Sequence, residues 1–338
     1  MNKIDFVIPW VDGGDPEWIA EKNKYSGLVE TSIDASIARY RDWDNLKYWF
    51  RGVEKFTPWV HKVYFVTCGQ IPEWLNTDYE KLVCVHHKDY IPEKYLPVFS
   101  VNPIELNMHR IKGLSEQFVY FNDDTFLLSP VKPENFFVNG LPCDYAVESP
   151  ITPNRKDVFN NLLVNNMILL NENYDRKEVL KKYKSKFYSL ADKKGLVTNL
   201  CFMPLRRNDF FGFEYAHLPS PFLKSTLKAV WKESFAWLDE TCKHRFRSSE
   251  DVNQYIFHNY QYVNGKFYPY CWRKDGLAIH INDGKENNNV EELCDIIRKG
   301  SYKMICANEA DVTDFENTKN KVNKALKERL PKKSKFEK

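Results

Sequence analysis

The chain lacks the signals that would take it out of the cytosol or into a membrane. Its N-terminus enters the apolar run at residues 4–8 at once, and Asp5 lies inside that run, so no secretory leader is recognisable. The longest apolar stretch, residues 162–170, is split by Asn165 and Asn166. It is far shorter than the roughly 20 residues that a membrane-spanning helix needs. We therefore expect a cytoplasmic protein.

Paired cysteines, glycine-rich phosphate loops and internal repeats are absent as well. The eight cysteines are scattered without a C-x-x-C pair, so their spacing does not indicate zinc, and we expect most of them to be small buried apolar residues. Neither common phosphate-binding glycine pattern occurs. The composition is that of an ordinary globular protein, with 43% hydrophobic, 28% charged and 15% aromatic residues. The aromatic residues fit either a well-filled core or a sugar-binding surface.

Positive charge is concentrated at the C-terminal end. Residues 319–338 contain eight Lys and one Arg against two Glu, whereas the whole chain has a net charge of only +3. Val322, Leu326 and Leu330 repeat every four residues, which predicts a solvated final helix over residues 314–330. A basic surface of this kind could also contact anionic lipid, and both interpretations remain open. We expect no nucleic-acid partner.

The first 130 residues alternate strand-like and helix-like segments. Strands are predicted over residues 4–11, 63–66, 82–85 and 118–121, and helices over residues 43–56 and 102–113. This alternation predicts an α/β fold with a mostly parallel sheet flanked by helices, in which ligands bind beyond the carboxyl ends of the strands. Two acidic turns, at Asp12 and at Asp123-Asp124, fall at such ends, and we expect a site there.

Beyond residue 130 the alternation weakens. Repeated prolines and a basic polar stretch favour an irregular or helical insertion over residues 131–200. Regular structure is predicted to return with helices near residues 223–243 and 249–260.

The strongest local signal is Asn122-Asp123-Asp124, directly after a predicted strand. Adjacent carboxylates in this place can hold Mg²⁺ or Mn²⁺ against a diphosphate, and an Asx turn is the alternative. The turn that begins at Trp10 offers a similar choice. It either binds a nucleotide, through Asp12 and the turn amides around Gly13, or only ends a strand.

Three further groups allow two interpretations each. Glu105 completes a capping box with Asn102, but His109 lies four residues further on the same predicted helix face, and the pair could transfer a proton. His217 lies in a proline-flanked extended segment and is either structural or catalytic. Arg247 precedes a predicted helix start, where a cation is unfavourable unless an anion such as phosphate binds beside it; an acidic partner nearby is the alternative.

Together these segments resemble four conserved regions of the stealth family, which includes bacterial capsule phosphotransferases and the animal N-acetylglucosamine-1-phosphotransferase that marks lysosomal enzymes. The regions follow one another over nearly the whole chain. Their most similar stretches are IDFVIPWVDG (4–13), FTPWV (56–60), YFNDD (120–124), AHLP (216–219), HRFRSSED (244–251) and ICANE (305–309).

The resemblance implies a Rossmann-like, glycosyltransferase-A-like core and a sugar-phosphate transferase. A hydroxyl of a polysaccharide or oligosaccharide acceptor would attack the sugar-linked phosphate of a UDP-hexose or UDP-N-acetylhexosamine, so that a phosphodiester forms and UMP leaves. Residues 1–130 would bind the nucleotide-sugar, 131–200 would be the insertion, and 201–338 would complete the catalytic domain. The enzyme would use Mg²⁺ or Mn²⁺, in the cytoplasm or at the inner face of the membrane.

Carried over residue by residue, the resemblance assigns roles to residues of this chain. Catalytic roles fall on Glu105, Asp123, His217 and Arg247, substrate contacts on Trp10, Asp12, Gly13, Arg110, Asn122 and Asn308, and metal binding on Asp123 and Asp124. The general base is either His217 or Glu105. The chain departs from the family at Glu309, where Asp is frequent, so we expect no metal ligand there. Two rival functions remain: a metal-dependent glycosyltransferase that releases UDP, and a non-catalytic carbohydrate-binding subunit.

Overall fold

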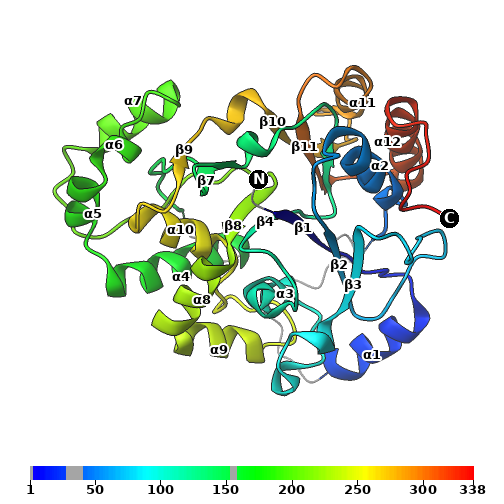
Figure 1. Cartoon of the computed structure of the whole chain (residues 1–338), viewed down its shortest axis with the longest axis horizontal. Helices are drawn as coiled ribbons and strands as arrows, with labels where there is room; N and C mark the ends of the chain where they lie inside the picture. Colours follow the sequence, from blue (N-terminus) through cyan, green and yellow to red (C-terminus); the bar gives the residue numbers. More distant parts are fainter. Residues whose placement is uncertain (1–2, 28–40, 153–157) are drawn as a thin grey trace.

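A five-stranded sheet forms the centre of the molecule. The computed structural model describes residues 3–27, 41–152 and 158–338. The central strands are β1 (Ile4–Pro9), β2 (Val63–Thr67), β3 (Leu82–His86), β4 (Gln117–Tyr120) and β8 (Ser220–Leu223). They lie in the order β3-β2-β1-β4-β8; the first four run parallel, and β8 pairs antiparallel with β4 (Figure 1). The mostly parallel sheet predicted from the sequence is confirmed.

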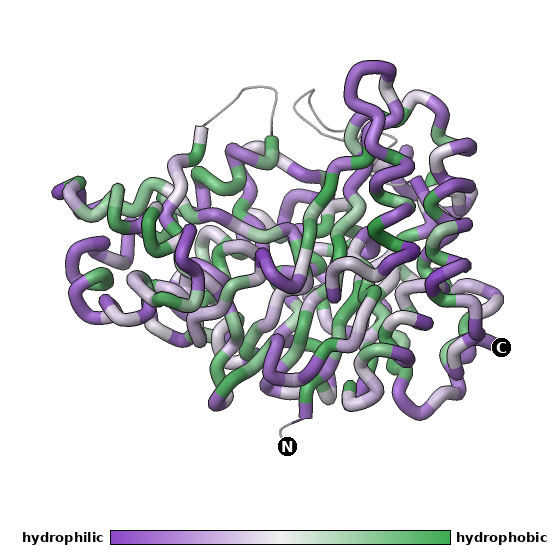
Figure 2. The backbone as a smooth tube through the Cα atoms, turned by 90° about the horizontal axis from the view of Figure 1, so that it is seen from above, coloured by the Kyte–Doolittle hydropathy of each residue, from purple (hydrophilic) through white to green (hydrophobic). Residues whose placement is uncertain are grey.

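Helices cover both faces of this sheet because side chains alternate along each strand. Phe6 and Ile8 of β1 enter one core, whose helices are α2 (Leu46–Phe56), α11 (Val290–Lys299) and α12 (Phe315–Arg329). Val7 enters the opposite core, whose helices are α3 (Val101–Leu106), α8 (Lys224–Glu233), α9 (Phe235–Lys243) and α10 (Tyr255–Val263). Figure 2 shows the apolar strands inside and the more polar helices around them. The predicted α/β class is therefore confirmed.

A second sheet joins the first through a short turn. It contains β5 (Thr125–Leu127), β10 (Gly276–Asn282) and β11 (Met304–Asp311). β10 and β11 run parallel, and β11 pairs antiparallel with β5. Because β5 begins directly after the turn at residues 121–124, which itself follows β4, that turn connects the two sheets. The sequence did not predict this sheet, since β5 is too short to show a periodicity.

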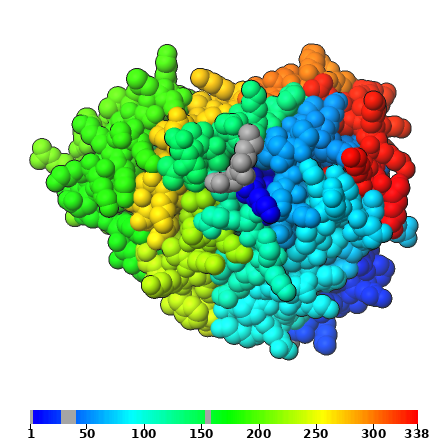
Figure 3. Space-filling view, viewed as in Figure 1, coloured from blue at the N-terminus to red at the C-terminus, as the bar shows by residue number. Residues whose placement is uncertain are grey.

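The predicted insertion is largely helical. Its helices are α4 (Val158–Asn173), α5 (Arg176–Lys182), α6 (Lys184–Phe187) and α7 (Lys193–Phe202). They lie at one end of the molecule, on the left in Figures 1 and 3. Side chains of α4, α5 and α6 form a separate apolar cluster with Phe213 and with Tyr262 of α10. The two strands before them, β6 (Phe137–Val138) and β7 (Leu141–Asp144), form a small sheet with β9 (Tyr268–Pro269). The domain boundaries themselves stay a prediction.

The helix predicted over residues 102–113 is shorter and differently capped. Ser100 caps α3 by accepting a hydrogen bond from the Asn102 amide at 3.4 Å. The Asn102 side chain instead donates to Asp251, 149 residues away in the sequence, at 2.8 Å. The capping box predicted for Asn102 and Glu105 is therefore wrong, and Glu105 has other partners.

The helix predicted over residues 249–260 is α10, which starts later than expected. The residues before it form a turn, in which Asp251 accepts from the backbone amide of Ser248 at 2.9 Å and lies 2.6 Å from Nδ1 of His244. Arg247 consequently does not sit at a helix N-terminus. The electrostatic argument that placed an anion there is wrong, because no helix dipole acts at that position.

The basic C-terminal region is folded onto the core. Its helix, α12, agrees with the prediction over residues 314–330. Beyond α12, the ring of Phe336 lies 5.0 Å from that of Phe50, and Arg51 donates two hydrogen bonds to Glu337 at 2.9 and 2.7 Å. Among the described residues, no helix is long and apolar enough to cross a membrane. Peripheral contact with anionic lipid, like the cytoplasmic location, stays a prediction.

We expect Phe336→Ala to destabilise the protein, because the ring is only 1% exposed and fills the space between α2 and the C-terminal segment. Removing a buried aromatic ring costs about 3–5 kcal/mol of unfolding free energy. Urea unfolding followed by circular dichroism would measure this loss. Lys332→Ala, at an exposed position in the same segment, is the control and should change stability by less than about 0.5 kcal/mol. Equal stability of the two variants would contradict the packing described.

Candidate active site

The turn at residues 121–124 is held by both sheets. The amide and hydroxyl of Thr125 donate to the carbonyl oxygen of Asn122 at 3.1 and 2.6 Å. On the other side, the amide of Ala307 in β11 donates to the carbonyl oxygen of Asp124 at 2.9 Å. The two carboxylates of this turn are therefore presented from a backbone that cannot shift without breaking strand contacts.

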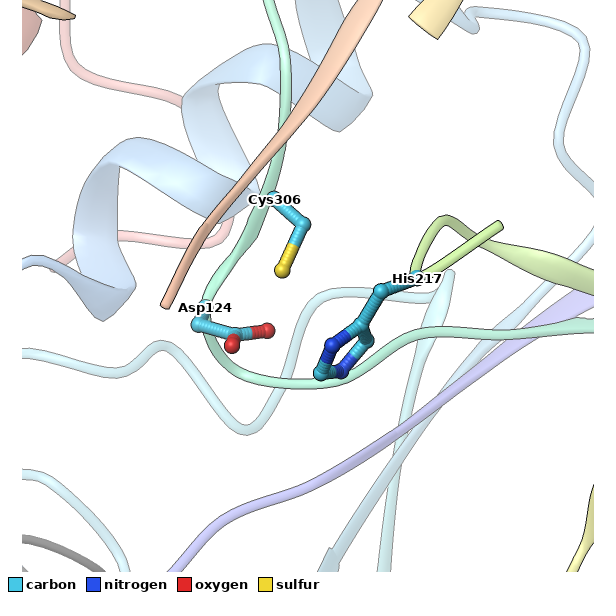
Figure 4. Close-up of side chains that lie close together, drawn as sticks. All are labelled: Asp124, His217 and Cys306. Atoms are coloured by element: carbon cyan, nitrogen blue, oxygen red, sulfur yellow. The ribbon is translucent and has the colours of Figure 1, made fainter. Parts of the chain in front are cut away.

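Pairing in both sheets brings three potential ligands together at this turn. In the antiparallel pair β4–β8, Tyr120 lies opposite Ser220, so the segment that carries His217 passes beside the turn. Cys306 in β11 lies opposite Thr125. One ligand atom each from Asp124, His217 and Cys306 lies within 4.8 Å of the others, and Figure 4 shows the three side chains pointing toward one another. Sequence analysis missed Cys306, because nothing in its spacing distinguishes it from the other cysteines.

The donor set fits a divalent cation. The Oδ1 atom of Asp124 is buried and has no hydrogen-bond partner in the described parts of the chain, which is costly unless a cation compensates it. Nε2 of His217 lies 2.7 Å from the side-chain amide of Asn122, so Nδ1 is the nitrogen left to face Asp124 and Cys306. The predicted role of Asp124 therefore has structural support, whereas that of Asp123 as a second ligand stays a prediction.

A group of carboxylates surrounds the same turn. The side chain of Asp123 is exposed, yet the surrounding protein raises its pKa, and the charges of Asp124 and Asp42 add to the effect. Burial also raises the pKa of Asp42, with further contributions from Asp44 and Asp12. Asp42 was not predicted, since only the fold brings the segment before α2 to the carboxyl edge of the sheet. Such a cluster of like charges favours a cation between or beside them.

The turn after β1 is stabilised by its own side chains. Oδ1 of Asp12 accepts from the amide of Gly14 at 2.8 Å, and Gln70 accepts from the Asp12 amide at 2.8 Å. These two turn amides already have partners, so the Asp12 carboxylate, rather than these amides, remains for a ligand. Gly13 is half-buried in the same turn. Trp10 stacks on a core ring, that of Phe65, with 5.8 Å between the ring centres, which gives it a structural role beside any substrate contact.

Glu105 and Arg247 lie near the end of β4, close enough for their charges to interact. Glu105 is buried and accepts from the hydroxyl of Tyr120, at the end of β4, at 2.6 Å. Burial raises the pKa of Glu105 to about 7, although Tyr120 and the charge of Arg247 act in the opposite direction. Arg247 is half-buried and has no hydrogen bond or ion pair to a residue within the described ranges. Its guanidinium therefore remains available for an anion.

His109 and Arg110, both within the predicted helix, lie away from the turn. α3 ends before His109, whose ring packs 5.8 Å from that of Trp231 in α8, and whose pKa is lowered to about 3 by burial. The prediction that Glu105 and His109 share a helix face is therefore wrong. Arg110 is exposed, donates to Asn107 at 2.9 Å and lies 4.9 Å from the centre of the Trp231 ring. The described contacts do not bring Arg110 to the turn, and its substrate contact stays a prediction.

The fourth predicted region lies on β11. Asn308 is two residues beyond Cys306, so its side chain is on the same face of the strand. Glu309 accepts from the indole N–H of Trp43 at 3.1 Å and pairs with Arg41 at 3.5 Å. It therefore anchors the segment that carries Asp42.

A buried chain of hydrogen bonds supports the segment that carries His217. Nδ1 of His258 in α10 lies 2.5 Å from Asp144, and its Nε2 lies 3.1 Å from the hydroxyl of Ser220. Tyr262 donates to the same carboxylate at 2.9 Å. The adjoining cavity of about 10 Å³ holds no more than about one water molecule. These hydrogen bonds therefore fix the start of β8, and the cavity beside them is too small for a substrate.

Comparison with known proteins gives matches to two family models. "Stealth protein CR1, conserved region 1" matches residues 2–29, and "Stealth protein CR2, conserved region 2" matches residues 39–143. These matches confirm the first two regions recognised in the sequence, whereas the third and fourth stay predictions.

Similar curated proteins cover the whole chain. The receptor polysaccharide phosphotransferase WefC of Streptococcus oralis is 44% identical over 100% of both chains, and the capsular polysaccharide phosphotransferase WcwK of Streptococcus pneumoniae is 42% identical over 100% of both. The exopolysaccharide phosphotransferase cps2G of Lactiplantibacillus plantarum is 38% identical over 99% of this chain and 96% of its own.

Comparison with solved structures gives distant matches. Mouse xyloside xylosyltransferase 1 in its apo form has a TM-score of 0.36 and 9% identity, over 90% of this chain and 98% of its own. An active-site mutant of LgtC has a TM-score of 0.38 and 11% identity, over 95% of each chain. Scores this low give no information on chemistry.

We expect the stability of the protein to depend on pH through Glu105. Its pKa rises from 4.5 to about 7 on folding, so its contribution is fully present below about pH 4.5 and is lost as the pH rises through 7. Glu105→Gln imitates the protonated form and avoids this loss. Relative to the wild type, its unfolding free energy should therefore increase by about 2–3 kcal/mol between about pH 5 and pH 8.

Urea unfolding across that pH range would measure the difference. Glu286→Gln, at an exposed position, is the matched control and should follow the wild-type curve at every pH. Parallel curves for Glu105→Gln and the wild type would show that Glu105 is ionised in the folded state at its ordinary pKa.

Proposed function

This chain belongs to the stealth family of polysaccharide phosphotransferases, and from that premise we propose that it transfers hexose 1-phosphate from a UDP-sugar to a glycan hydroxyl. The donor would be a UDP-hexose or UDP-N-acetylhexosamine, the bond formed a phosphodiester, and the nucleotide released UMP. Relatives named as polysaccharide phosphotransferases are similar over the full length, which supports a transferase of polysaccharide synthesis. The observation that supports the finer reaction is the joint position of Asp124, His217 and the Asp12 turn at one sheet edge.

Phosphoryl transfer depends on positioning and on neutralising the charge of the phosphates. A divalent cation bound at Asp124 would supply that neutralisation for the diphosphate of the donor. The turn that carries Asp124 is fixed by both sheets, so the charge is placed before the substrate arrives. We assign the nucleotide contact to the Asp12 turn, which follows the neighbouring strand β1.

Arg247 and Glu105, near the end of β4, would act on the transferring group. Arg247 offers a guanidinium without a partner among the described residues, and a guanidinium can hold two phosphate oxygens at once. We assign Glu105 as the proton acceptor, since a pKa of about 7 suits a group that exchanges a proton near neutral pH. His217 is less suited to that role, because Asn122 already contacts its Nε2.

The released nucleotide is the direct test of the reaction. We expect the protein, given a divalent cation, a panel of UDP-sugars and a glycan acceptor, to release UMP, which chromatography separates from UDP. Asp124→Ala should abolish the release, because it removes the fixed carboxylate at the centre of the site. Lys332→Ala, on the surface, should release UMP at the wild-type rate.

The same measurement separates the rival functions. Release of UDP would identify a glycosyltransferase that cleaves at the anomeric carbon, and would contradict sugar-phosphate transfer. Donor binding without release of any nucleotide, unchanged in Asp124→Ala, would favour a non-catalytic carbohydrate-binding subunit.

Arg247→Lys should lower activity even though it keeps the positive charge. Lysine cannot form the two parallel hydrogen bonds of a guanidinium, and the loss of one charge-assisted bond corresponds to a decrease in kcat of about 10- to 100-fold. Steady-state kinetics would show a larger change in kcat than in KM if the bond forms in the transition state. Arg298→Lys, on the exposed face of α11, is the control. A kcat within about twofold of the wild type would remove Arg247 from the reaction.

A further inference from the structure

The cluster at the turn contains ligand atoms of three different kinds. Asp124 contributes a carboxylate oxygen, His217 an imidazole nitrogen and Cys306 a sulfur, and these atoms lie within 4.8 Å of one another. They come from the β4–β5 turn, the segment before β8, and β11, so three separate elements converge on one point (Figure 4). Sulfur and imidazole favour zinc-like ions, whereas Mg²⁺ prefers an all-oxygen set.

The surroundings of the cluster also fit a bound ion. Oδ1 of Asp124 is buried without a hydrogen-bond partner among the described residues, and Cys306 is completely buried although it carries a potential ligand. Asn122 contacts the ring nitrogen of His217 that faces away from the cluster, as the outer partners of metal-bound histidines do. If Nδ1 binds the ion, Nε2 carries the proton, and a half-turn of the Asn122 amide lets its oxygen accept it.

The spacing requires only a small adjustment. Ligands of a tetrahedral zinc-like ion lie about 2.0–2.3 Å from the metal and therefore about 3.5 Å from one another. The present separations of at most 4.8 Å would therefore have to close by no more than about 1.3 Å. Three protein ligands would leave a fourth position open, which is typical of catalytic rather than structural sites.

We propose that Asp124, His217 and Cys306 form a cation site with a sulfur ligand, and that this site binds Zn²⁺ or Co²⁺ in preference to Mg²⁺. The inference rests on the proposed function, because it names the class of ion at the same site. It differs from the expectation drawn from the sequence, in which Asp123 and Asp124 would hold Mg²⁺ or Mn²⁺.

Cobalt provides a test that does not depend on activity. Metal-free full-length protein is titrated with Co²⁺ under reducing conditions, and absorption is recorded in the near ultraviolet and the visible. A sulfur-to-cobalt charge-transfer band should grow to saturation at one equivalent. Cys306→Ser, which nearly preserves the size of the side chain, should lose the band and bind Co²⁺ at least about 10-fold more weakly.

Cys294→Ser is the matched control, because Cys294 is also fully buried but lies in α11, outside the cluster. Its spectrum and affinity should equal those of the wild type. Thermal unfolding of both variants would verify that they are folded, and competition with a large excess of Mg²⁺ should leave the band in place.

Absence of the band in the folded wild type, or its persistence in Cys306→Ser, would overturn the proposal, and so would displacement of Co²⁺ by equimolar Mg²⁺. The two proposals can fail separately. A band that depends on Cys306, together with release of UDP, would keep the cation site and reject sugar-phosphate transfer. Release of UMP without a band would keep sugar-phosphate transfer and reject the cation site.

Discussion

The turn at residues 121–124 is the constraint on which the site depends. It leaves the central sheet at β4 and enters the second sheet at β5, and backbone hydrogen bonds from Thr125 and Ala307 hold it on both sides. Strand pairing therefore fixes the positions of its carboxylates, whereas the local conformational preferences of Asp123 and Asp124 do not. A charge fixed in this way needs no reorganisation when an ionic ligand binds, which is the main source of electrostatic catalysis.

Groups of opposite charge lie near this turn. Carboxylates gather at the turn, and the surrounding protein, with their mutual repulsion added, raises the pKa values of Asp42 and Asp123. Arg247 lies within electrostatic reach of the buried Glu105. A cation relieves the repulsion of the carboxylates, and an anion satisfies the guanidinium. The metal-bound diphosphate of the proposed donor would combine both charges.

Local sequence patterns failed where a polar residue had a distant partner. Asn102 and Asp251 were each assigned to the start of their own helix, and each fits the usual capping pattern. In the structure they bond to each other at 2.8 Å, and both helices begin elsewhere. The misplaced helix start led to the wrong argument for an anion beside Arg247, and the misplaced helix end to the wrong pairing of Glu105 with His109. A buried polar residue must be bonded, but the sequence does not tell to which partner.

The sequence by itself determined the mostly parallel sheet flanked by helices and the acidic turns at Asp12 and Asp123-Asp124. These features follow from the alternation of strand-like and helix-like segments and from the turn residues next to single strands. Four similar segments in order also determined the family, which the full-length relatives confirm. Only the tertiary structure decided that Cys306 and Asp42 join the site and that Arg110 does not contact the turn. Cys306 reaches Asp124 through the pairing of β11 with a strand of three residues, about 180 positions away. A contact between segments so far apart produces no periodic pattern in the sequence.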